Sequence, residues 1–499
     1  MQMITLHKGT LKSLAVWTMF LPTAVFMFTW VRPLLAVPMA AALAAACVLF
    51  TRETLRHRRE DVFELSGFAL AAVICCALLW TFLAGQGGYF FQNEDHYGRN
   101  AIFHDLIHYS WPVRFPDTSY ALTYYVNYWM LPALVGKAVA SIVGEQAAFA
   151  AANAALFMQT AFVLTLLFLM LCGYLRTRSL FPTVLALLVF VLFSGMDILG
   201  AALKNDLYNQ IEWWAETFQY SSHTTCLFWV YNQSVMAWLG MMVLMQERSL
   251  RSAGLLCLLT LPYSPLPFVG MAALLMGLFI AACLDRGFVA SVKEAFSLRS
   301  VLALLAVVPV FACYFGANQA VSEHPLRVDL FLNAYTPRVA FFRYVLFVLL
   351  EFGLYALILG PANRREPLFW AATATLLVAP LLRMGVNFDF AMRASIPGLF
   401  VLSVLCARFL LDAVRERRRR YAAAVLTGLL LIGAVTPMME FERGAYRVVQ
   451  AGHMGLIADP FGTVLHPDAD TFNFICADTS QSAFYRYMAR DYRQTEDGR

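Results

Sequence analysis

Two apolar runs near the N-terminus decide the fold. Residues 14–30 read LAVWTMFLPTAVFMFTW and residues 34–50 read LLAVPMAAALAAACVLF. Each run is close in length to the about 20 apolar residues with which an α-helix crosses the hydrocarbon core of a bilayer. Lys8 and Lys12 precede the first run, as in a signal peptide, but no convincing small-residue cleavage site separates the two runs. We therefore expect a hairpin of two membrane-spanning helices.

The composition extends this interpretation to most of the chain. Of the 499 residues, 60% are hydrophobic and only 14% are charged, whereas about a quarter of the residues of a soluble domain are charged. A single soluble domain is excluded, and continuous apolar runs argue against alternating barrel strands. The net charge of +5 is small for this length and argues against nucleic acid as a partner. The 10 cysteines form no CxxC pair, so a zinc or redox site is not indicated.

The distribution of Lys and Arg orders the helices, because short cytoplasmic loops are enriched in these residues. If every basic cluster is cytoplasmic, an even number of crossings separates each neighbouring pair. Residues 120–143 must then lie along the membrane interface rather than span. This predicts an all-α polytopic membrane protein with about 13 transmembrane helices. The basic clusters lie at residues 52–59, 176–178, 248–251, 286–299, 364–365 and 415–420.

The predicted spans have uneven lengths. The short pair at 255–283 could instead be a broken or re-entrant hairpin, with the later orientation unchanged. The spans cover about residues 14–30, 34–50, 62–84, 147–172, 180–193, 228–245, 255–261, 268–283, 301–315, 339–360, 368–382, 391–411 and 421–437.

This topology places most of the residues between the spans on the outer side. We expect a transmembrane domain over residues 1–437, with a large outer loop at 85–146 that carries interfacial helices, and a short outer C-terminal tail at 438–499. No P-loop, GxGxxG motif, repeat or low-complexity tract is present, which excludes a cytoplasmic ATP-driven domain in this chain. The candidate chemistry is therefore expected outside.

An acidic motif begins the large outer loop. Residues 85–96 read GQGGYFFQNEDH, so Glu94, Asp95 and His96 follow directly where the third span ends. A partly desolvated carboxylate beside another can have its pKa raised enough to accept a proton from a sugar hydroxyl. We predict Asp95 as the catalytic residue, with Glu94 and His96 beside it. The alternative is a solvated helix end.

The next segment has the pattern of a short interfacial helix. Residues 101–108 read AIFHDLIH, with apolar side chains on one helical face and His104, Asp105 and His108 on the other. His104 and His108 are possible substrate-binding residues. With the neighbouring acidic residues they could also hold a divalent metal, but no HExxH or comparable pattern supports this, so no metal cofactor is predicted.

These features together resemble the GT-C superfamily of integral-membrane glycosyltransferases. Besides the acidic motif and the His-bearing helix, the resemblance rests on Ser110-Trp111-Pro112, on the run Tyr124-Tyr125-Val126-Asn127-Tyr128 and on Leu131-Pro132-Ala133-Leu134. It covers the membrane plan and these short motifs, and no subfamily is identified. The resemblance implies an inverting transferase that uses sugars carried on a polyprenyl phosphate on the outer side. It implies that Asp95, with Glu94 beside it, serves as base.

A second outer motif reads RMGVNFDFAMR over residues 383–393. A lipid phosphate needs cations at headgroup depth, and the forked guanidinium of Arg suits phosphate oxygens. We predict that Arg393 and Arg383 bind the donor phosphate, with Lys204 as a third candidate, and that Asp389 contacts substrate. The alternative is snorkelling of the arginines to headgroups or a local pair with Asp389.

Two further polar residues stand out. His223 follows a Trp- and Tyr-rich loop that resembles an aromatic belt, and it is a possible substrate-binding residue. Glu351 lies within the predicted span 339–360, where an unpaired charge is costly, so we expect it to be protonated, paired or facing a polar cavity.

The resemblance thus implies a glycosyltransferase, which we expect in a bacterial cytoplasmic membrane with its active site on the periplasmic side. Its expected partners are a polyprenyl-phosphate-linked sugar donor, membrane lipids, and a glycan, lipid or protein acceptor. One alternative is a transporter or lipid flippase, which should show paired repeats and charges near the membrane midplane. Another is a polysaccharide polymerase or ligase, which would share the outer site.

Overall fold

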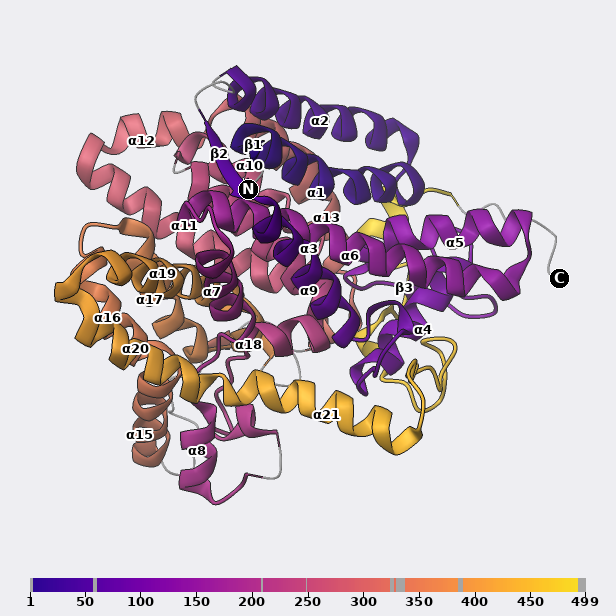
Figure 1. Cartoon of the computed structure of the whole chain (residues 1–499). Coiled ribbons are helices and arrows are strands. Elements are labelled where there is room, and N and C mark those ends of the chain that lie inside the picture. Colours follow the sequence, from indigo (N-terminus) through magenta and orange to yellow (C-terminus); the bar gives the residue numbers. More distant parts are fainter. Residues whose placement is uncertain are drawn as a thin grey trace.

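The computed structural model of the chain describes residues 3–56, 61–207, 210–247, 249–323, 327–328, 337–384 and 389–491. Helices dominate this part of the chain (Figure 1). Within it, 9 helices are long and apolar enough to cross a bilayer, and three shorter apolar helices accompany them. The predicted all-α polytopic membrane architecture is confirmed at this level, whereas the count of 13 spans stays a prediction.

The long helices include two composite ones, in which a second helix continues the first. They are α1 (Lys8–Trp30), α2 (Pro33–Arg56), α6 (Glu145–Leu175), α9 (His223–Glu247), α11 (Pro265–Arg286), α13 (Leu298–Phe315), α15 (Pro337–Val348) continued through a π-helical turn (Leu349–Gly353) by α16 (Leu354–Asn363), α19 (Ile396–Arg415), and α20 (Arg420–Gly433) followed by α21 (Val435–Ala451). The shorter apolar helices are α3 (Gly67–Leu83), α7 (Leu180–Val191) and α17 (Pro367–Val378).

The predicted span at 255–261 is the least regular part of the bundle. It corresponds to α10 (Leu250–Leu258), which has nine residues and is therefore only about 14 Å long, too short to cross a bilayer. The chain turns after α10 and enters α11 at Pro265, with Ser264 as the N-cap. Proline at the first helical position favours such a restart. The structure therefore favours the broken-hairpin alternative.

Residues 120–143 form no long apolar helix, as the charge parity predicted. They contain the 3-10 turn Val126–Trp129 and the 13-residue helix α5 (Met130–Ile142). Helix α5 packs along α6 (Figure 1).

Several basic segments lie together on one face. Strand β1 (Met3–His7) pairs antiparallel with β2 (Val62–Ser66), and the backbone N–H of Ser66 donates to the carbonyl of Arg178. Lys12 is ion-paired with both Asp61, next to β2, and Glu247, and Glu53 is ion-paired with Arg299 and Arg251. The predicted inner loops that contain these residues therefore share a side. Arg58 lies outside the described residues.

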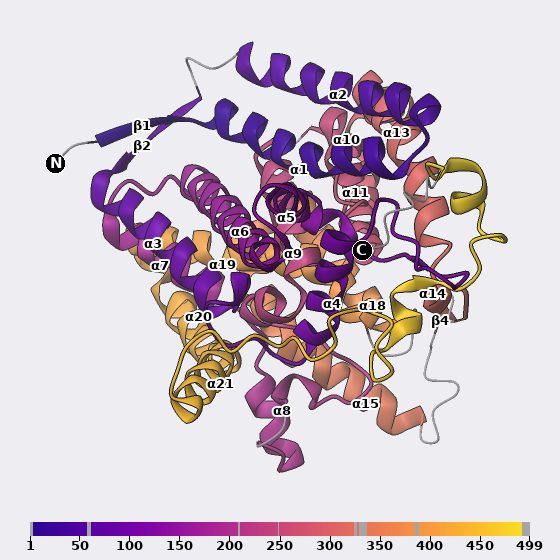
Figure 2. The same ribbon diagram turned by 90° about the vertical axis from the view of Figure 1, so that its right-hand side faces the viewer.

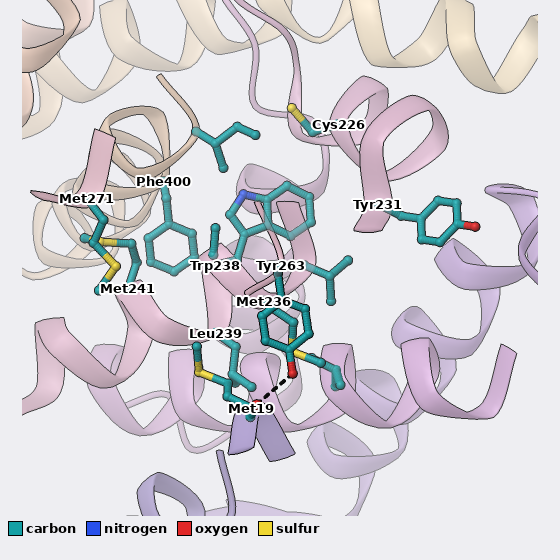
Figure 3. Packing of buried hydrophobic residues seen from close by; sticks show 14 of the residues in the cluster. Met19, Cys226, Tyr231, Met236, Trp238, Leu239, Met241, Tyr263, Met271 and Phe400 are labelled. Atoms are coloured by element: carbon teal, nitrogen blue, oxygen red, sulfur yellow. Dashed lines mark hydrogen bonds between the residues drawn. The ribbon is translucent and has the colours of Figure 1, made fainter. Parts of the chain in front are cut away.

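The centre of the bundle is built around α9, which is buried along nearly all of its length. Figure 3 shows Trp238 and Met241 of α9 beside Phe400 of α19. The hydroxyl of Tyr263, from the turn after α10, donates a 2.7 Å hydrogen bond to the carbonyl of Met19 on α1. Because a buried hydroxyl is costly without a partner, this bond helps to fix the position of the turn.

Part of the C-terminal segment lies beside helix α4 (Asp95–His108). A strap, defined as residues 452–474, follows α21 and runs beside α4 (Figure 2). It leads into β6 (Ile475–Cys476), which pairs antiparallel with β3 (Ala121–Leu122). The C-terminal tail thus packs directly on the loop at 85–146. The other short elements are α8 (Asp197–Lys204), α12 (Phe288–Ala295), α14 (Gln319–Glu323), β4 (Arg327–Val328), β5 (Leu382–Arg383) and α18 (Asp389–Ala394).

Candidate functional site

Helix α4 carries the acidic motif and begins earlier than the sequence pattern indicated. Its first residue is Asp95, and Glu94 stands at the N-cap without a side-chain capping bond. A carboxylate in the first turn is favoured by the helix dipole. Asp95 also forms an ion pair of 2.8 Å with Arg99, one turn later. The same helix therefore holds a carboxylate and a guanidinium side by side.

The structure brings Asp95 and Arg393 into one electrostatic cluster, although they are far apart in the sequence. Arg393 Nη1 lies 2.6 Å from Asp389 Oδ2 on α18, and the charge of Arg393 also acts on Asp95. Tyr124, from the aromatic loop before α5, interacts with the charges of both arginines and both carboxylates. We call these five residues, Asp95, Arg99, Tyr124, Asp389 and Arg393, the Asp95 cluster.

The protonation state of Asp95 differs from the expectation. Burial alone would raise its pKa, but the charges of Arg99 and Arg393 outweigh burial and hold the pKa below its ordinary value. The expected upward shift was wrong, because the sequence pattern did not reveal either arginine as a neighbour. Asp95 is ionised at neutral pH, and its side chain is 43% exposed. It can therefore accept a proton from a bound molecule.

The two arginines are incompletely paired. The side chain of Arg99 is only 5% exposed, yet its Nε and Nη1 atoms have no hydrogen-bond partner among the described residues, and the same holds for Nε of Arg393. Buried donors normally find partners, and leaving them unsatisfied costs about 1–3 kcal/mol or more for a charged group. These vacant donors favour an anionic ligand.

His96 is a different kind of group. It is buried, stacks on Tyr231, and lies with Nδ1 3.0 Å from Asn93 Oδ1. Burial and the charge of Arg99 lower its pKa to about 3, so it is neutral. Because the amide nitrogen of Asn93 donates to the carbonyl of Phe228, its oxygen accepts from Nδ1–H. Nε2 is then a vacant acceptor within the described part of the chain, suited to a hydroxyl.

The other predicted phosphate ligands lie elsewhere. Lys204, at the end of α8, forms a 2.8 Å ion pair with Glu216, which also binds Arg343. Arg383 stands on β5 opposite Arg327 of β4. Residues 385–388, between Arg383 and Asp389, are outside the described ranges. Neither Lys204 nor Arg383 belongs to the Asp95 cluster as defined, and their phosphate role stays a prediction.

The predicted histidines do not converge. His104 Nε2 lies 2.7 Å from Asp459 in the strap, and its ring stacks on Phe149. His108 is exposed and only loosely paired with Glu145. His223 is buried, with Nδ1 2.9 Å from the carbonyl of Phe190. Among the residues with described positions, no three His, Cys, Asp or Glu side chains are arranged to hold a metal.

Two features escaped the sequence analysis. Arg99 could have been found, because its spacing of four residues from Asp95 places both on one helical face. The second is a buried acid pair: Glu351 accepts a 2.9 Å bond from Trp214, and Asp197 accepts bonds from Ser194 and Thr436. Glu351 and Asp197 also contact each other. Glu351 was expected to be protonated, paired or facing a polar cavity, and the structure shows it paired and 1% exposed.

Comparisons with known proteins give no assignment, since no protein-family model, curated protein or solved structure matches this chain.

Proposed function

We propose that this chain is a membrane glycosyltransferase of the GT-C type. It transfers a sugar from a polyprenyl-phosphate donor to a hydroxyl of a glycan, lipid or protein acceptor, on the outer side of a bacterial cytoplasmic membrane. The observation that carries the proposal is the Asp95 cluster. It holds an ionised, accessible carboxylate next to two arginines whose side chains are 5% and 12% exposed and which have donors without a partner among the described residues.

The carboxylate supplies the base. The acceptor oxygen attacks the anomeric carbon, while the bond from that carbon to the phosphate oxygen breaks and its electron pair leaves with the polyprenyl phosphate. The hydroxyl proton of the acceptor moves to Asp95. Because attack occurs opposite the leaving group, the anomeric configuration inverts. The lowered pKa of Asp95 keeps it deprotonated before the reaction, as a base requires.

Arg393 supports the departure of the phosphate. Its side chain is 12% exposed and is ion-paired with Asp389, and Nε has no partner among the described residues. A fixed cation beside the leaving group stabilises the charge that develops there, and it does so more strongly in a site from which water is largely excluded. The base and the leaving-group cation thus lie in one cluster, which is the arrangement that a displacement reaction needs.

A turnover assay tests the proposal. The purified protein in lipid nanodiscs is incubated with decaprenyl-phosphate-linked sugars, one hexose and one pentose, and with bacterial lipid and glycan extracts as acceptors, and the release of decaprenyl phosphate is measured. Asp95→Asn should lower the rate by about 10² to 10⁴. Glu94→Gln is the matched control, since Glu94 is the exposed neighbour, and its effect should be milder.

The donor dependence tests Arg393 separately. Arg393→Ala should raise the donor concentration needed for half-maximal rate, and Arg393→Lys should recover only part of the loss, because lysine lacks the fork. A full rate in Asp95→Asn would refute the mechanism. Movement of intact donor across the bilayer without release of decaprenyl phosphate would favour a transporter instead.

A further inference from the structure

We infer that Arg99 and Arg393 form a phosphate-binding pair, and that Arg99 gives up its ion pair with Asp95 when the phosphate binds. This inference rests on the proposed function for the identity of the phosphate carrier, a polyprenyl donor. The pair itself rests on the donors that both arginines leave unpartnered and on the charges that both exert on Asp95 and Tyr124.

Each arginine is ion-paired with one carboxylate and keeps donors without a partner. Arg99 contacts Asp95 through Nη2, and Arg393 contacts Asp389 through Nη1. Among the described residues, nothing accepts from Nε or Nη1 of Arg99 or from Nε of Arg393. Each vacant N–H can donate a charge-assisted hydrogen bond to a phosphate oxygen. The side chains of Arg99 and Arg393 are therefore each ion-paired with a carboxylate and still have N–H groups that can donate to an anion.

A purely structural arginine in the same molecule has a different environment. Arg299 is also 5% exposed, but its two terminal nitrogens bind Ser252 and Glu53. In the described part of the chain, no nitrogen of Arg299 is buried without a partner. Burial alone thus does not explain the vacant donors of Arg99.

The surroundings hold Arg99 in place. Its guanidinium carbon lies 6.0 Å from the centre of the Tyr231 ring, and the Tyr231 hydroxyl accepts a 2.9 Å bond from Trp129. A fixed aromatic ring orients the planar cation at little entropic cost. The vacant nitrogens are therefore oriented before a ligand arrives, which favours binding.

Exchange of the ion pair follows from charge. A bound phosphate and Asp95 are both negative and compete for Arg99, so the phosphate weakens the hold of Arg99 on the carboxylate. Neutralising both arginines also removes the influence that lowers the pKa of Asp95. The carboxylate of Asp95 becomes a stronger base only when the donor is present, which limits proton transfer in the empty site.

The groups that face Asp95 are Arg99 and His96 of α4, Arg393 and Asp389 of α18, and Tyr124.

Binding of a sugar-free probe tests the inference without any transfer reaction. Farnesyl phosphate is titrated by calorimetry into the full-length protein in nanodiscs, with inorganic phosphate as a second arm that separates a lipid carrier from free phosphate. Arg99→Ala and Arg393→Ala should each raise the Kd at least about tenfold, in line with the loss of a charge-assisted bond. Arg99→Lys should lie between. Arg343→Ala, which removes an arginine paired with Glu216 and not part of the Asp95 cluster, should stay within about twofold.

Asp95→Asn tests the exchange itself. Removing the competing charge should tighten farnesyl phosphate binding by several-fold, whereas a merely structural ion pair would leave it unchanged or weaker. Wild-type affinity in Arg99→Ala, or unchanged affinity in Asp95→Asn, would overturn the inference and leave the proposed transfer intact. Tight phosphate binding by a protein that fails the turnover assay would overturn the transferase and keep the pair.

Discussion

Asp105 on α4 provides a pH-sensitive attachment for the strap. Its side chain is 2% exposed, and Oδ2 accepts a 3.0 Å hydrogen bond from the backbone N–H of Val464. Burial raises the pKa of Asp105 from 3.8 to about 7, although the bonds from Val464 and Thr463 act in the opposite direction. The sequence had placed Asp105 on the wet face of an interfacial helix. That was wrong, because the strap covers it.

The sign of the pH dependence follows from the raised pKa. The attached state favours the protonated acid, so its stabilising contribution is fully present below the unfolded pKa of 3.8 and is lost as pH rises through about 7. At about 1.4 kcal/mol per pKa unit, the attachment should weaken by about 2.5 kcal/mol between pH 5 and pH 8. This corresponds to an about 70-fold change in the opening equilibrium of the strap.

Hydrogen exchange of residues 456–466, corrected for the intrinsic rate at each pH, measures this opening. Asp105→Asn keeps an oxygen for Val464 but has no titratable charge, so its protection should be nearly independent of pH. The pair between His104 and Asp459 is present in both proteins, and the difference between them isolates Asp105. Asp468→Asn removes an exposed carboxylate from the same segment and should behave as the wild type. Equal protection at pH 5 and pH 8 in the wild type would refute the reasoning.

Two further predictions concern packing and topology. A methyl group at Gly200 would overlap the Trp214 ring, whereas one at Gly428 would meet no atom of the described residues within 4 Å. Gly200→Ala should therefore lower the free energy of unfolding by about 1–3 kcal/mol and lower the thermal midpoint of unfolding in detergent. Gly428→Ala is the control and should leave the midpoint unchanged. Equal midpoints for the two variants would contradict the packing of Gly200 against Trp214. A phosphatase fused after the C-terminus should be active, and one fused in the loop at residues 364–365 inactive; the reverse pattern would exclude the proposed orientation.

The sequence alone determined the membrane architecture, because hydropathy is a local property. The runs at residues 14–30 and 34–50 became α1 and α2, with one or two turns added at the ends. Charge parity also identified residues 120–143 as a segment that forms no long apolar helix. It could not define α10, where prolines and the turn at Tyr263 divide an apolar stretch that a hydropathy average reads as continuous.

Only the tertiary structure decided the neighbours of each charged group. Asp95 and Arg393 come from distant segments, and their proximity depends on how α4 and α18 pack, which no local pattern encodes. The same packing reversed the expected pKa shift of Asp95 and raised that of Asp105. Electrostatic interactions depend on distance and burial in space. Residue type and spacing could therefore identify Asp95 and Asp105 as candidate carboxylates. The pKa of Asp95 depends on neighbouring arginines, and the pKa of Asp105 depends on burial under the strap.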